Sequence, residues 1–535
     1  MWLPPLDAEI DLGPLLERTA PGWLRMPVGV VDRPREQAQE PLVLDLSGSA
    51  GHLAVVGAPR TGKSTLLCTV VAALAATCPP DEVQAYAVDL GGGLLHRLGD
   101  LPHVGAVCGP REAELAHRLV RELRSLLFER ERRFRDLAID SMASWHELRR
   151  TGLDLGDHGE VFLVVDNWAA FARELPELEA EVIELAASGL HYGVHLVLAA
   201  NRWAELRPGL RENLGGRLEL RLNDPLESEL GRSAAAALPG LPGRGLTQAG
   251  HQFQAALPGP ASAIGDRARP SRGGGVAPPP RLLPTLVGES ALQSADPSLG
   301  VPFAVEEHRL EMVGLDLFGG SPHLLVLGDA ECGKTSLLRL VARQLATRHP
   351  PEEVALVVVD LRRGLLDLTG IPNLAGYVGT PAAVAEAVDQ LHRELTEPGS
   401  ATQGRRRRHV VLVDDYDLLP ASAGSPLLPL LDLLGLGREL GFHLVLARRV
   451  AGAARAGFEP VFQRLRELGG TGLVMSGDPG EGPLLGGQKA ASLPPGRGFL
   501  VRPRRPPTLV QVVYSPAADG GEPAGARPQG RVGEG

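Results

Sequence analysis

Two patterns of apolar residues alternate along most of the chain. Short continuous apolar runs end at a polar residue, whereas longer stretches carry leucine, valine and alanine at intervals of three and four. A continuous run is typical of a strand buried on both faces, and the wider spacing is typical of an amphipathic helix. We predict strands at residues 28–31, 42–44, 53–56, 85–88, 104–107, 161–165, 194–199, 324–327 and 442–446, and at 218–222 as the last strand of the first half. This alternation predicts an α/β fold with mainly parallel, doubly wound sheets.

The longest predicted helical stretch runs from Arg111 to Arg150. Leu115, Leu119 and Leu123 recur on one side of it, and an Arg/Glu-rich run occupies residues 129–135. We interpret the charged run as a solvated helix face, in preference to a nucleic-acid patch.

The two halves of the chain repeat the same landmarks. Lys63 and Lys334 are 271 positions apart (334 − 63), as are Asp89 and Asp360 in two Val-Asp-Leu segments. Later landmarks, two Gly-x-His-Leu-Val-Leu segments among them, are 248 positions apart. Because the spacing falls from 271 to 248, the second half lacks 23 residues (271 − 248) in the region that corresponds to the long helical stretch of the first half. The repeat predicts two tandem domains of one fold.

Composition sets the expected domain boundaries. Proline, glycine, serine and alanine dominate residues 258–300, which is typical of a linker, and residues 515–535 have the composition of a disordered tail. The domains are then expected at 46–257 and 301–514. A Pro-rich N-terminal segment, residues 1–45, is expected to pack on the first domain and cover its sheet.

Each domain carries one Gly-rich loop between a predicted strand and a predicted helix. Both loops match GxxxxGK[ST], whose backbone N–H groups and following helix start bind phosphate oxygens. Lys63 and Lys334 are expected to reach the β- and γ-phosphates of ATP. They are two of only three lysines among 54 basic residues, so a compact ammonium is retained where phosphate is expected. The predicted cofactor-binding residues are Gly57, Ala58, Pro59, Arg60, Thr61, Gly62, Lys63, Ser64, Thr65, Gly328, Asp329, Ala330, Glu331, Cys332, Gly333, Lys334, Thr335 and Ser336.

A carboxylate ends the apolar strand that is expected beside each loop. Such a residue holds Mg²⁺ together with the loop hydroxyl, often through water. The predicted metal ligands are Ser64, Asp166, Thr335 and Asp414, and the predicted catalytic residues are Asp166, Asp414, Asp415 and Asn201.

Composition restricts the class of protein. Apolar residues make up 44% and charged residues 22% of the chain, and the net charge of −10 disfavours a nucleic-acid partner. The four cysteines lack metal-ligand spacing and are expected to be reduced thiols. Neither a signal peptide nor an apolar run of membrane-spanning length is apparent. We therefore expect a cytoplasmic protein that reaches a membrane through partners.

Several stretches resemble the FtsK/SpoIIIE branch of P-loop ATPases and, within it, EccC, the ATPase of type VII secretion systems. The likeness extends from Val28 to about Tyr514, and it is carried by residues 28–34, 138–142, 201–208, 413–417 and 473–477. EccC proteins carry three ATPase modules after transmembrane helices. This chain resembles the split form, EccCb, with the second and third modules only.

The resemblance implies two RecA/FtsK-like P-loop domains that bind ATP and Mg²⁺. It also implies a membrane-anchored partner ATPase, EccCa, an oligomeric secretion complex, and a location at the inner face of the cell membrane. The implied substrates are small helical-hairpin proteins that are recognised through a C-terminal signal.

The sequence departs from an active ATPase after each strand-end aspartate. That position usually holds a glutamate, which orients and deprotonates water, but Asn167 and Asp415 occur here. Arg449 replaces the strand-end asparagine in the second domain, and Ser228-Glu229 replaces the Ser-Arg of DNA translocases, a candidate arginine finger. We therefore expect both domains to bind ATP·Mg²⁺ and to hydrolyse it slowly or not at all.

Two other functions remain open at this stage, a DNA-translocating motor and a catalytically silent adaptor whose nucleotide stabilises the fold. Two surface features are also ambiguous. We interpret Arg405–Arg408 as a solvated loop in preference to a site for acidic groups, and residues 427–436 as a core helix in preference to a peptide groove.

Overall fold

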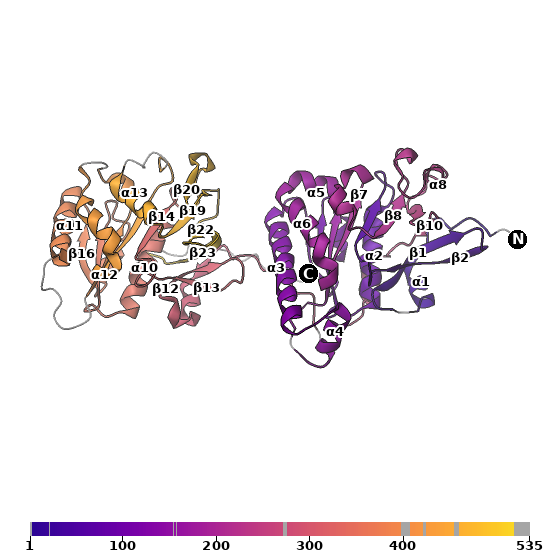
Figure 1. Ribbon diagram of the computed structural model, residues 1–535, viewed down its shortest axis with the longest axis horizontal. Coiled ribbons are helices and arrows are strands. Elements are labelled where there is room, and N and C mark those ends of the chain that lie inside the picture. Colours follow the sequence, from indigo (N-terminus) through magenta and orange to yellow (C-terminus); the bar gives the residue numbers. More distant parts are fainter. Residues whose placement is uncertain are drawn as a thin grey trace, which may run out of the picture. The chain divides into compact units, whose positions relative to one another are not determined.

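The computed structural model describes residues 3–20, 22–153, 155–156, 158–270, 275–396, 407–420, 424–453 and 459–517. The chain divides into two compact units, unit 1 up to Leu282 and unit 2 from Leu283 onward (Figure 1). The division lies inside the segment 258–300 that the sequence predicts as a linker. Each unit contains one large sheet with helices on both faces.

The described part of unit 1 forms a ten-stranded sheet in the order β2-β1-β10-β9-β8-β3-β7-β6-β4-β5. The strands from β8 to β5 are parallel, and the other four extend the sheet in antiparallel fashion. In this order the bounds are Ala38–Asp45, Arg25–Arg33, Gln252–Ala255, Arg244–Thr247, Gly216–Leu220, Leu53–Val56, Val194–Ala200, Glu160–Asp166, Val83–Asp89 and Val104–Cys108.

Unit 2 repeats this arrangement in the order β13-β12-β23-β22-β19-β14-β18-β17-β15-β16, and the short β11 (Val287–Gly288) pairs with β23. In both units one strand separates the strand before the phosphate loop from the strand that leads to the aspartate. In the order given, the bounds are Met312–Leu315, Val301–Glu306, Thr508–Tyr514, Arg497–Val501, Thr471–Met475, His323–Leu327, Phe442–Arg448, Arg408–Val413, Val354–Val359 and Leu374–Val378.

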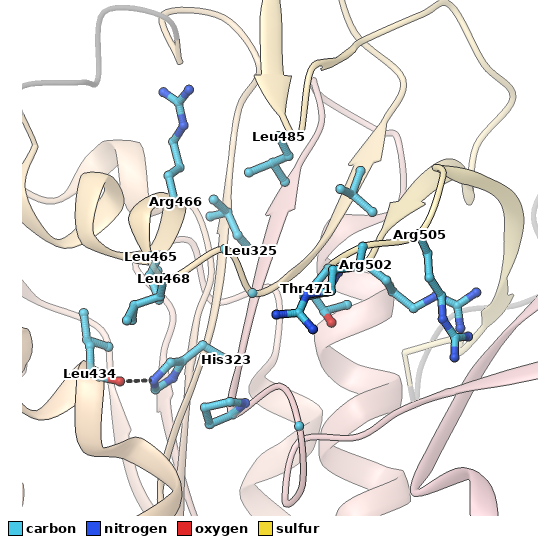
Figure 2. A pocket seen from close by; sticks show the side chains of 18 of the residues that line it. His323, Leu325, Leu434, Leu465, Arg466, Leu468, Thr471, Leu485, Arg502 and Arg505 are labelled. Atoms are coloured by element: carbon cyan, nitrogen blue, oxygen red, sulfur yellow. Dashed lines mark hydrogen bonds between the residues drawn. The ribbon is translucent and has the colours of Figure 1, made fainter.

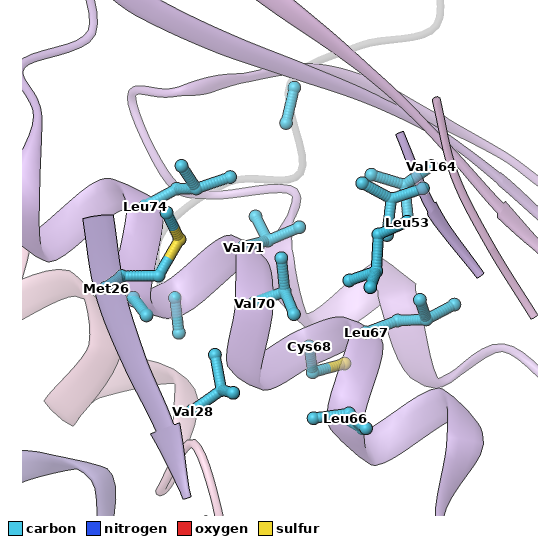
Figure 3. Close-up of a cluster of buried hydrophobic side chains, with 14 of the residues drawn as sticks. Met26, Val28, Leu53, Leu66, Leu67, Cys68, Val70, Val71, Leu74 and Val164 are labelled. Atoms are coloured by element: carbon cyan, nitrogen blue, oxygen red, sulfur yellow. The ribbon is translucent and has the colours of Figure 1, made fainter. Parts of the chain in front are cut away.

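Apolar layers cover both faces of the unit 1 sheet, because successive residues of a strand point to opposite sides. Leu53 and Val55 of β3 join the layer of α2, whereas Ala54 and Val56 join the layer of α3, α5 and α6. Figure 3 shows the first layer, in which α2 packs between β1 and the parallel strands. The helices are α1 (Leu12–Arg18), α2 (Lys63–Thr77) and α9 (Ala261–Arg267) on one face, and α3 (Ala113–Asp136), α5 (Trp168–Glu174) and α6 (Pro176–Ser188) on the other.

Unit 2 is layered in the same way and confirms the predicted doubly wound α/β fold. Helix α10 (Lys334–Arg348) packs on one face, and α11 (Pro381–Thr396), α13 (Pro460–Glu467) and the 3-10 helix η10 (Leu428–Leu436) pack on the other. Leu430 and Leu434 of η10 are buried in that second layer. Most of the apolar segment at 427–436 is therefore core.

The remaining elements are short and lie at the ends of strands and helices. They are α4 (Met142–Arg150), α7 (Pro208–Arg211), α8 (Arg232–Ala236), α12 (Gly437–Leu440), β20 (Pro483–Leu485) and β21 (Gln488–Lys489), with 3-10 helices at Leu94–Leu98, Gly189–Tyr192, Trp203–Glu205, Pro225–Glu227, Glu289–Ser294, Pro297–Leu299, Leu366–Gly370, Tyr416–Leu418 and Pro479–Glu481.

The single helical stretch predicted at 111–150 is wrong, because the chain turns between α3 and α4. Ala138 has a left-handed backbone with φ of 51°, and the Ser141 hydroxyl accepts a hydrogen bond from the Ser144 N–H at the start of α4. The turn brings Phe134 and Trp145 into one small apolar cluster. In unit 2 the counterpart, α11, is 16 residues long against 24 for α3, in line with the deletion.

Two expectations about unit 1 also need correction. The strand predicted as the last, at 218–222, is β8, and the short β9 and β10 follow it. Their sequences are short and partly polar, so only pairing with their neighbours makes them strands. The N-terminal segment covers the sheet only through α1, which packs on one face, whereas β1 and β2 join the sheet as its edge strands.

The boundary segments contain ordered residues. Helix α9 lies within residues 258–300, and Ser515, at the start of the expected tail, is buried and bonded to Ser336. Residues 518–535, together with Gly273, Gly274, Arg405 and Arg406, lie outside the described residues.

Candidate functional site

Each phosphate loop joins a buried strand to a 15-residue helix, β3 to α2 in unit 1 and β14 to α10 in unit 2. Arg60 and Gly62 have left-handed φ angles of 64° and 102°, and Glu331 and Gly333 at the matching positions have 60° and 106°. A Cβ atom on Gly62 would also lie 2.9 Å from the backbone nitrogen of Gly243. Glycine is therefore required there, and the two loops share one left-handed pattern.

The loop lysines donate hydrogen bonds to carbonyl oxygens of their own loops. Lys63 Nζ lies 2.7 Å from Gly57 O and 2.9 Å from Ala58 O, and Lys334 Nζ lies 2.8 Å from Asp329 O. Burial lowers the pKa of Lys63, although nearby carboxylates act in the opposite direction. Charged phosphate oxygens are stronger acceptors than carbonyls, so each ammonium is placed to exchange these bonds for phosphate.

A cavity of about 590 Å³ surrounds the loop of unit 1. Its position follows from the sheet order, because β7 lies between β3 and β6 and its carboxyl end places Asn201 beside both the loop and Asp166. The cavity is lined by residues that include Lys63, Ser64, Gly91, Asp166, Asn167 and Asn201. The structure thus brings together the candidate residues of the first domain.

The donor set of unit 1 fits a magnesium ion. Asp166 Oδ2 is buried and has no hydrogen-bond partner in the described part of the chain. Burial raises the pKa of Asp166, whereas a hydrogen bond from Ser64 and the charge of Lys63 lower it. A carboxylate oxygen without a partner, next to a loop hydroxyl, suits Mg²⁺, which takes its other ligands from phosphate and water.

Unit 2 places the matching donors in contact with each other. Thr335 Oγ1 donates to Asp414 Oδ2 at 2.7 Å, and burial raises the pKa of Asp414. No group of three or more His, Cys, Asp or Glu side chains suited to a metal occurs among the described residues. A metal at either loop would therefore depend on phosphate oxygens for much of its coordination.

The residue after each aspartate has a left-handed backbone, with φ of 68° for Asn167 and 47° for Asp415. Asn167 accepts a hydrogen bond from the Ala170 N–H at 3.3 Å and donates to Leu90 O at 3.1 Å. The oxygen and the nitrogen of its side-chain amide are therefore both hydrogen-bonded within the protein. In addition, an amide cannot take a proton from water. Asp415 instead forms an ion pair with Arg362, whose Nε lies 2.8 Å from Asp415 Oδ2.

The two strand ends beside the loops differ in charge. In unit 1 the Asn201 N–H donates to Glu205 Oε2 at 2.9 Å. In unit 2 the Arg449 N–H donates to Asp417 Oδ1 at 3.2 Å, and its side chain lies 3.7 Å from the same carboxylate. A neutral amide in one unit thus corresponds to a paired guanidinium in the other.

Sequence reasoning missed two features of these sites. A turn after the parallel strands braces each loop, since Gly243 N–H donates to Thr61 O at 2.7 Å and Gly496 N–H donates to Cys332 O at 2.8 Å. The position occupied by Gly91 in unit 1 and by Arg362 in unit 2 was also missed. The signal was present, because both residues follow a Val-Asp-Leu segment at the offset of 271.

All four cysteines are free and buried. Burial raises the pKa of Cys332, which lies inside the second phosphate loop. Of the helices in the described ranges, none combines the length and the hydropathy that crossing a bilayer requires.

The family model described as "FtsK/SpoIIIE family" matches residues 16–271 and 284–414. Among curated relatives, the ESX-4 secretion system protein EccC4 of Mycobacterium tuberculosis is 46% identical over 533 residues, covering 96% of this chain and 43% of the relative. The ESX-1 secretion system protein EccCb1 of Mycolicibacterium smegmatis is 34% identical over 547 residues, covering 94% of this chain and 91% of the relative. The chain thus spans less than half of EccC4 and nearly all of EccCb1.

A solved structure described as "Thermomonospora curvata EccC (ATPases 2 and 3) in complex with a signal sequence peptide" matches with a TM-score of 0.83 and 40% identity, over 96% of this chain and all of that one. EssC (ATPases 2 and 3) from Geobacillus thermodenitrificans matches with a TM-score of 0.67 at 18% identity, which shows a shared fold. Proteins with this P-loop fold in general bind a nucleotide together with Mg²⁺. The chain therefore belongs to the FtsK/SpoIIIE family and, within it, to the EccC proteins of type VII secretion systems.

Proposed function

We propose that this chain binds ATP·Mg²⁺ in both units and hydrolyses it slowly or not at all, as part of a type VII secretion motor. One observation carries the proposal. In both units a complete phosphate loop lies beside a strand-end aspartate that no glutamate follows. Such a site retains the groups that bind a nucleotide and lacks the usual base.

Unit 1 has residues that bind the nucleotide and Mg²⁺, but it lacks one that activates water. Lys63 and the loop amides hold the phosphates, and Ser64 and Asp166 hold Mg²⁺, which neutralises phosphate charge. Asn167 cannot accept the proton of an attacking water, and the loss of a well-placed base costs about 10²- to 10⁴-fold in rate. In unit 2 the Arg362 guanidinium pairs with Asp415, which opposes its use as a base.

The two loop lysines provide the test. We expect the purified chain to bind about two ATP per molecule in the presence of Mg²⁺, and Lys63→Ala and Lys334→Ala each to remove one of them. Isothermal titration calorimetry measures the stoichiometry, and a phosphate-release assay measures turnover. Turnover at ordinary motor rates would refute the hydrolysis part of the proposal. Hydrolysis that DNA stimulates in a salt-dependent way would instead favour a DNA translocase.

We further propose that unit 2 binds the C-terminal signal of secreted helical-hairpin proteins. The Thermomonospora curvata structure is described as a complex with a signal sequence peptide. In this chain a cavity of about 410 Å³ lies at the start of β14, at the opposite end of that strand from the phosphate loop. Figure 2 shows Leu434, Leu465 and Leu468 on one side of it and Arg502 and Arg505 on the other. An apolar floor with basic groups suits an apolar peptide with acidic residues.

A pair of leucines tests this site. Leu468 lines the cavity and is 38% exposed, whereas Leu436 is 53% exposed and does not line it. We expect Leu468→Asp to weaken the binding of a synthetic C-terminal signal peptide about tenfold or more, and Leu436→Asp to leave it unchanged. Fluorescence anisotropy of the labelled peptide gives both affinities. Equal affinities of the two variants would contradict the assignment.

The remaining parts of the proposal concern the assembly. We propose that the chain works in the cytoplasm with a membrane-anchored EccCa-type ATPase, and that this partner brings it to the inner face of the membrane. The similarity to the ESX-1 secretion system protein EccCb1, over 91% of that protein, supports a place in such a secretion system. Co-purification of the chain with a membrane-anchored EccCa-type ATPase from the same organism tests this part, and failure of the two to associate would argue against it.

A further inference from the structure

One cation lies beside the candidate catalytic carboxylate of unit 2. The side chain of Arg362 is 52% exposed, and its Nε lies 2.8 Å from Oδ2 of Asp415, which is 16% exposed. Asp415 directly follows Asp414, which accepts a hydrogen bond from Thr335 of the phosphate loop. The residue after the strand-end aspartate faces the γ-phosphate in P-loop ATPases, so Arg362 lies on that side of the site.

The loop that carries Arg362 is attached to the site by its backbone. The loop begins at Asp360, directly after β15, and the Leu365 N–H donates to Asp360 Oδ2 at 2.6 Å. Gly364 lies against the phosphate loop, since a Cβ atom there would be 3.1 Å from Thr335 Cγ2. These contacts hold the loop beside the site and leave the side chain of Arg362 about half exposed.

Unit 1 has no side chain at the matching position. Subtracting the offset of 271 from 362 gives Gly91, which lines the cavity around the first phosphate loop. A Cβ atom on Gly91 would overlap Asp166 Oδ2. At this position, next to that of the terminal phosphate, unit 2 therefore carries a cation that unit 1 lacks, in addition to the exchange of Asn201 for Arg449.

We propose that Arg362 exchanges Asp415 for the γ-phosphate of a bound nucleoside triphosphate, so that unit 2 discriminates a triphosphate from a diphosphate. This inference rests on the proposed binding of ATP by unit 2. The Arg362 side of the ion pair is half exposed and screened by solvent, so the pair contributes modestly to stability and a phosphate can displace it. The guanidinium fork matches two phosphate oxygens, which carry more charge than one carboxylate. A diphosphate lacks the γ-phosphate, so the ion pair between Arg362 and Asp415 stays intact.

The test isolates unit 2 within the full chain. In a Lys63→Ala background, calorimetry measures the affinities for Mg²⁺–ADP and for the Mg²⁺ complex of the non-hydrolysable imido analogue of ATP. We expect Arg362→Ala to weaken the analogue about 10- to 100-fold, the range for a lost charge-assisted hydrogen bond, and to leave the ADP affinity unchanged. Arg362→Lys retains the charge without the fork and is expected to give an intermediate loss.

Arg438 supplies the matched control. Its side chain is 65% exposed in α12, which precedes β18 and so lies at the other end of the strands. Arg438→Ala removes the same charge and is expected to change neither affinity. Equal weakening of both nucleotides by Arg362→Ala, or an unchanged analogue affinity, would overturn the inference. If the Lys63→Ala chain binds no nucleotide while the Lys334→Ala chain does, the proposed function of unit 2 is itself wrong, and the inference is overturned with it.

Discussion

Gly91 limits how the strand-end carboxylate of unit 1 can be placed. We expect Gly91→Ala to displace the side chain of Asp166, because the added methyl group would overlap Oδ2 of that residue. Shifting a metal ligand or its support costs about 10- to 100-fold in affinity, and we expect a loss of this size for ATP·Mg²⁺ in unit 1. Calorimetry in a Lys334→Ala background measures it. Gly209→Ala is the control, since a Cβ atom there meets nothing within 4 Å.

Two buried histidines of the repeat are locked in the neutral state. Nδ1 of His52 accepts a hydrogen bond from the Leu196 N–H at 2.8 Å, and Nδ1 of His323 accepts one from the Leu444 N–H at 3.0 Å. A protonated ring could not accept these bonds. Burial, with the charge of His195 added, lowers the pKa of His52 to about 4, and burial also lowers the pKa of His323.

The lowered pKa values of these histidines determine how the stability of the fold depends on pH. The unfolded histidine, with a pKa near 6.5, binds a proton before the folded one does, so stability is lost as the pH falls from about 6.5 towards 4. For His52 the loss between pH 7 and pH 5 is about 2 kcal/mol. We expect His52→Gln to reduce the pH dependence of the unfolding free energy of unit 1 by this amount, as measured by urea denaturation. An equal reduction in the variant of the exposed His96 would contradict the prediction.

At the scale of elements, the α3–α4 pair stabilises unit 1 at the opposite end of the parallel strands from the proposed nucleotide site. The rings of Phe134 and Trp145 stack with centroids 5.5 Å apart, and the buried Arg130 donates to Tyr192 O and His158 O. These two carbonyls precede β7 and β6, whereas the phosphate loop lies at the carboxyl ends of the parallel strands. Variants of this pair should therefore change the stability of unit 1 without changing its nucleotide binding.

We expect Trp145→Ala to lower the unfolding free energy of unit 1 by about 3–5 kcal/mol, because it empties a buried aromatic site. Ser141→Ala, which removes the cap of α4, is expected to cost about 1 kcal/mol. Denaturant unfolding measures both losses, and calorimetry is expected to show unchanged ATP affinity in Ser141→Ala. Phe128, which is 71% exposed, provides a control whose substitution by alanine should cost little. A loss in Phe128→Ala as large as that in Trp145→Ala would refute the argument.

At the scale of the whole molecule, the two units have separate sheets and separate apolar cores. We expect two thermal transitions in differential scanning calorimetry. ATP·Mg²⁺ at 100 times its Kd stabilises a unit that binds it by about 2.7 kcal/mol, so both transitions should shift upward. Lys63→Ala should cancel the shift of one transition and Lys334→Ala that of the other. A single variant that cancels both shifts would show that the units do not bind nucleotide independently.

The phosphate loops and the strands that lead to the aspartates could be predicted because their signals are local. A loop of nine residues carries its own glycines, lysine and hydroxyl, and a run such as β6 is apolar throughout. The antiparallel part of the sheet was harder to predict. Strands β9 and β10 have four residues each, and they exist because β8 and β1, the latter far away in sequence, supply their hydrogen bonds.

By itself the sequence determined the tandem α/β repeat, both phosphate loops and the residues that follow each aspartate, since backbone preference and residue chemistry at those positions are set by near neighbours. Only the tertiary structure decided which distant groups meet there. It brought Gly243 to the first loop, turned α4 back on α3, and paired Arg362 with Asp415. Such contacts depend on how strands are ordered in the sheet and where loops cross their ends, and this order is selected by the burial of both sheet faces over the whole unit.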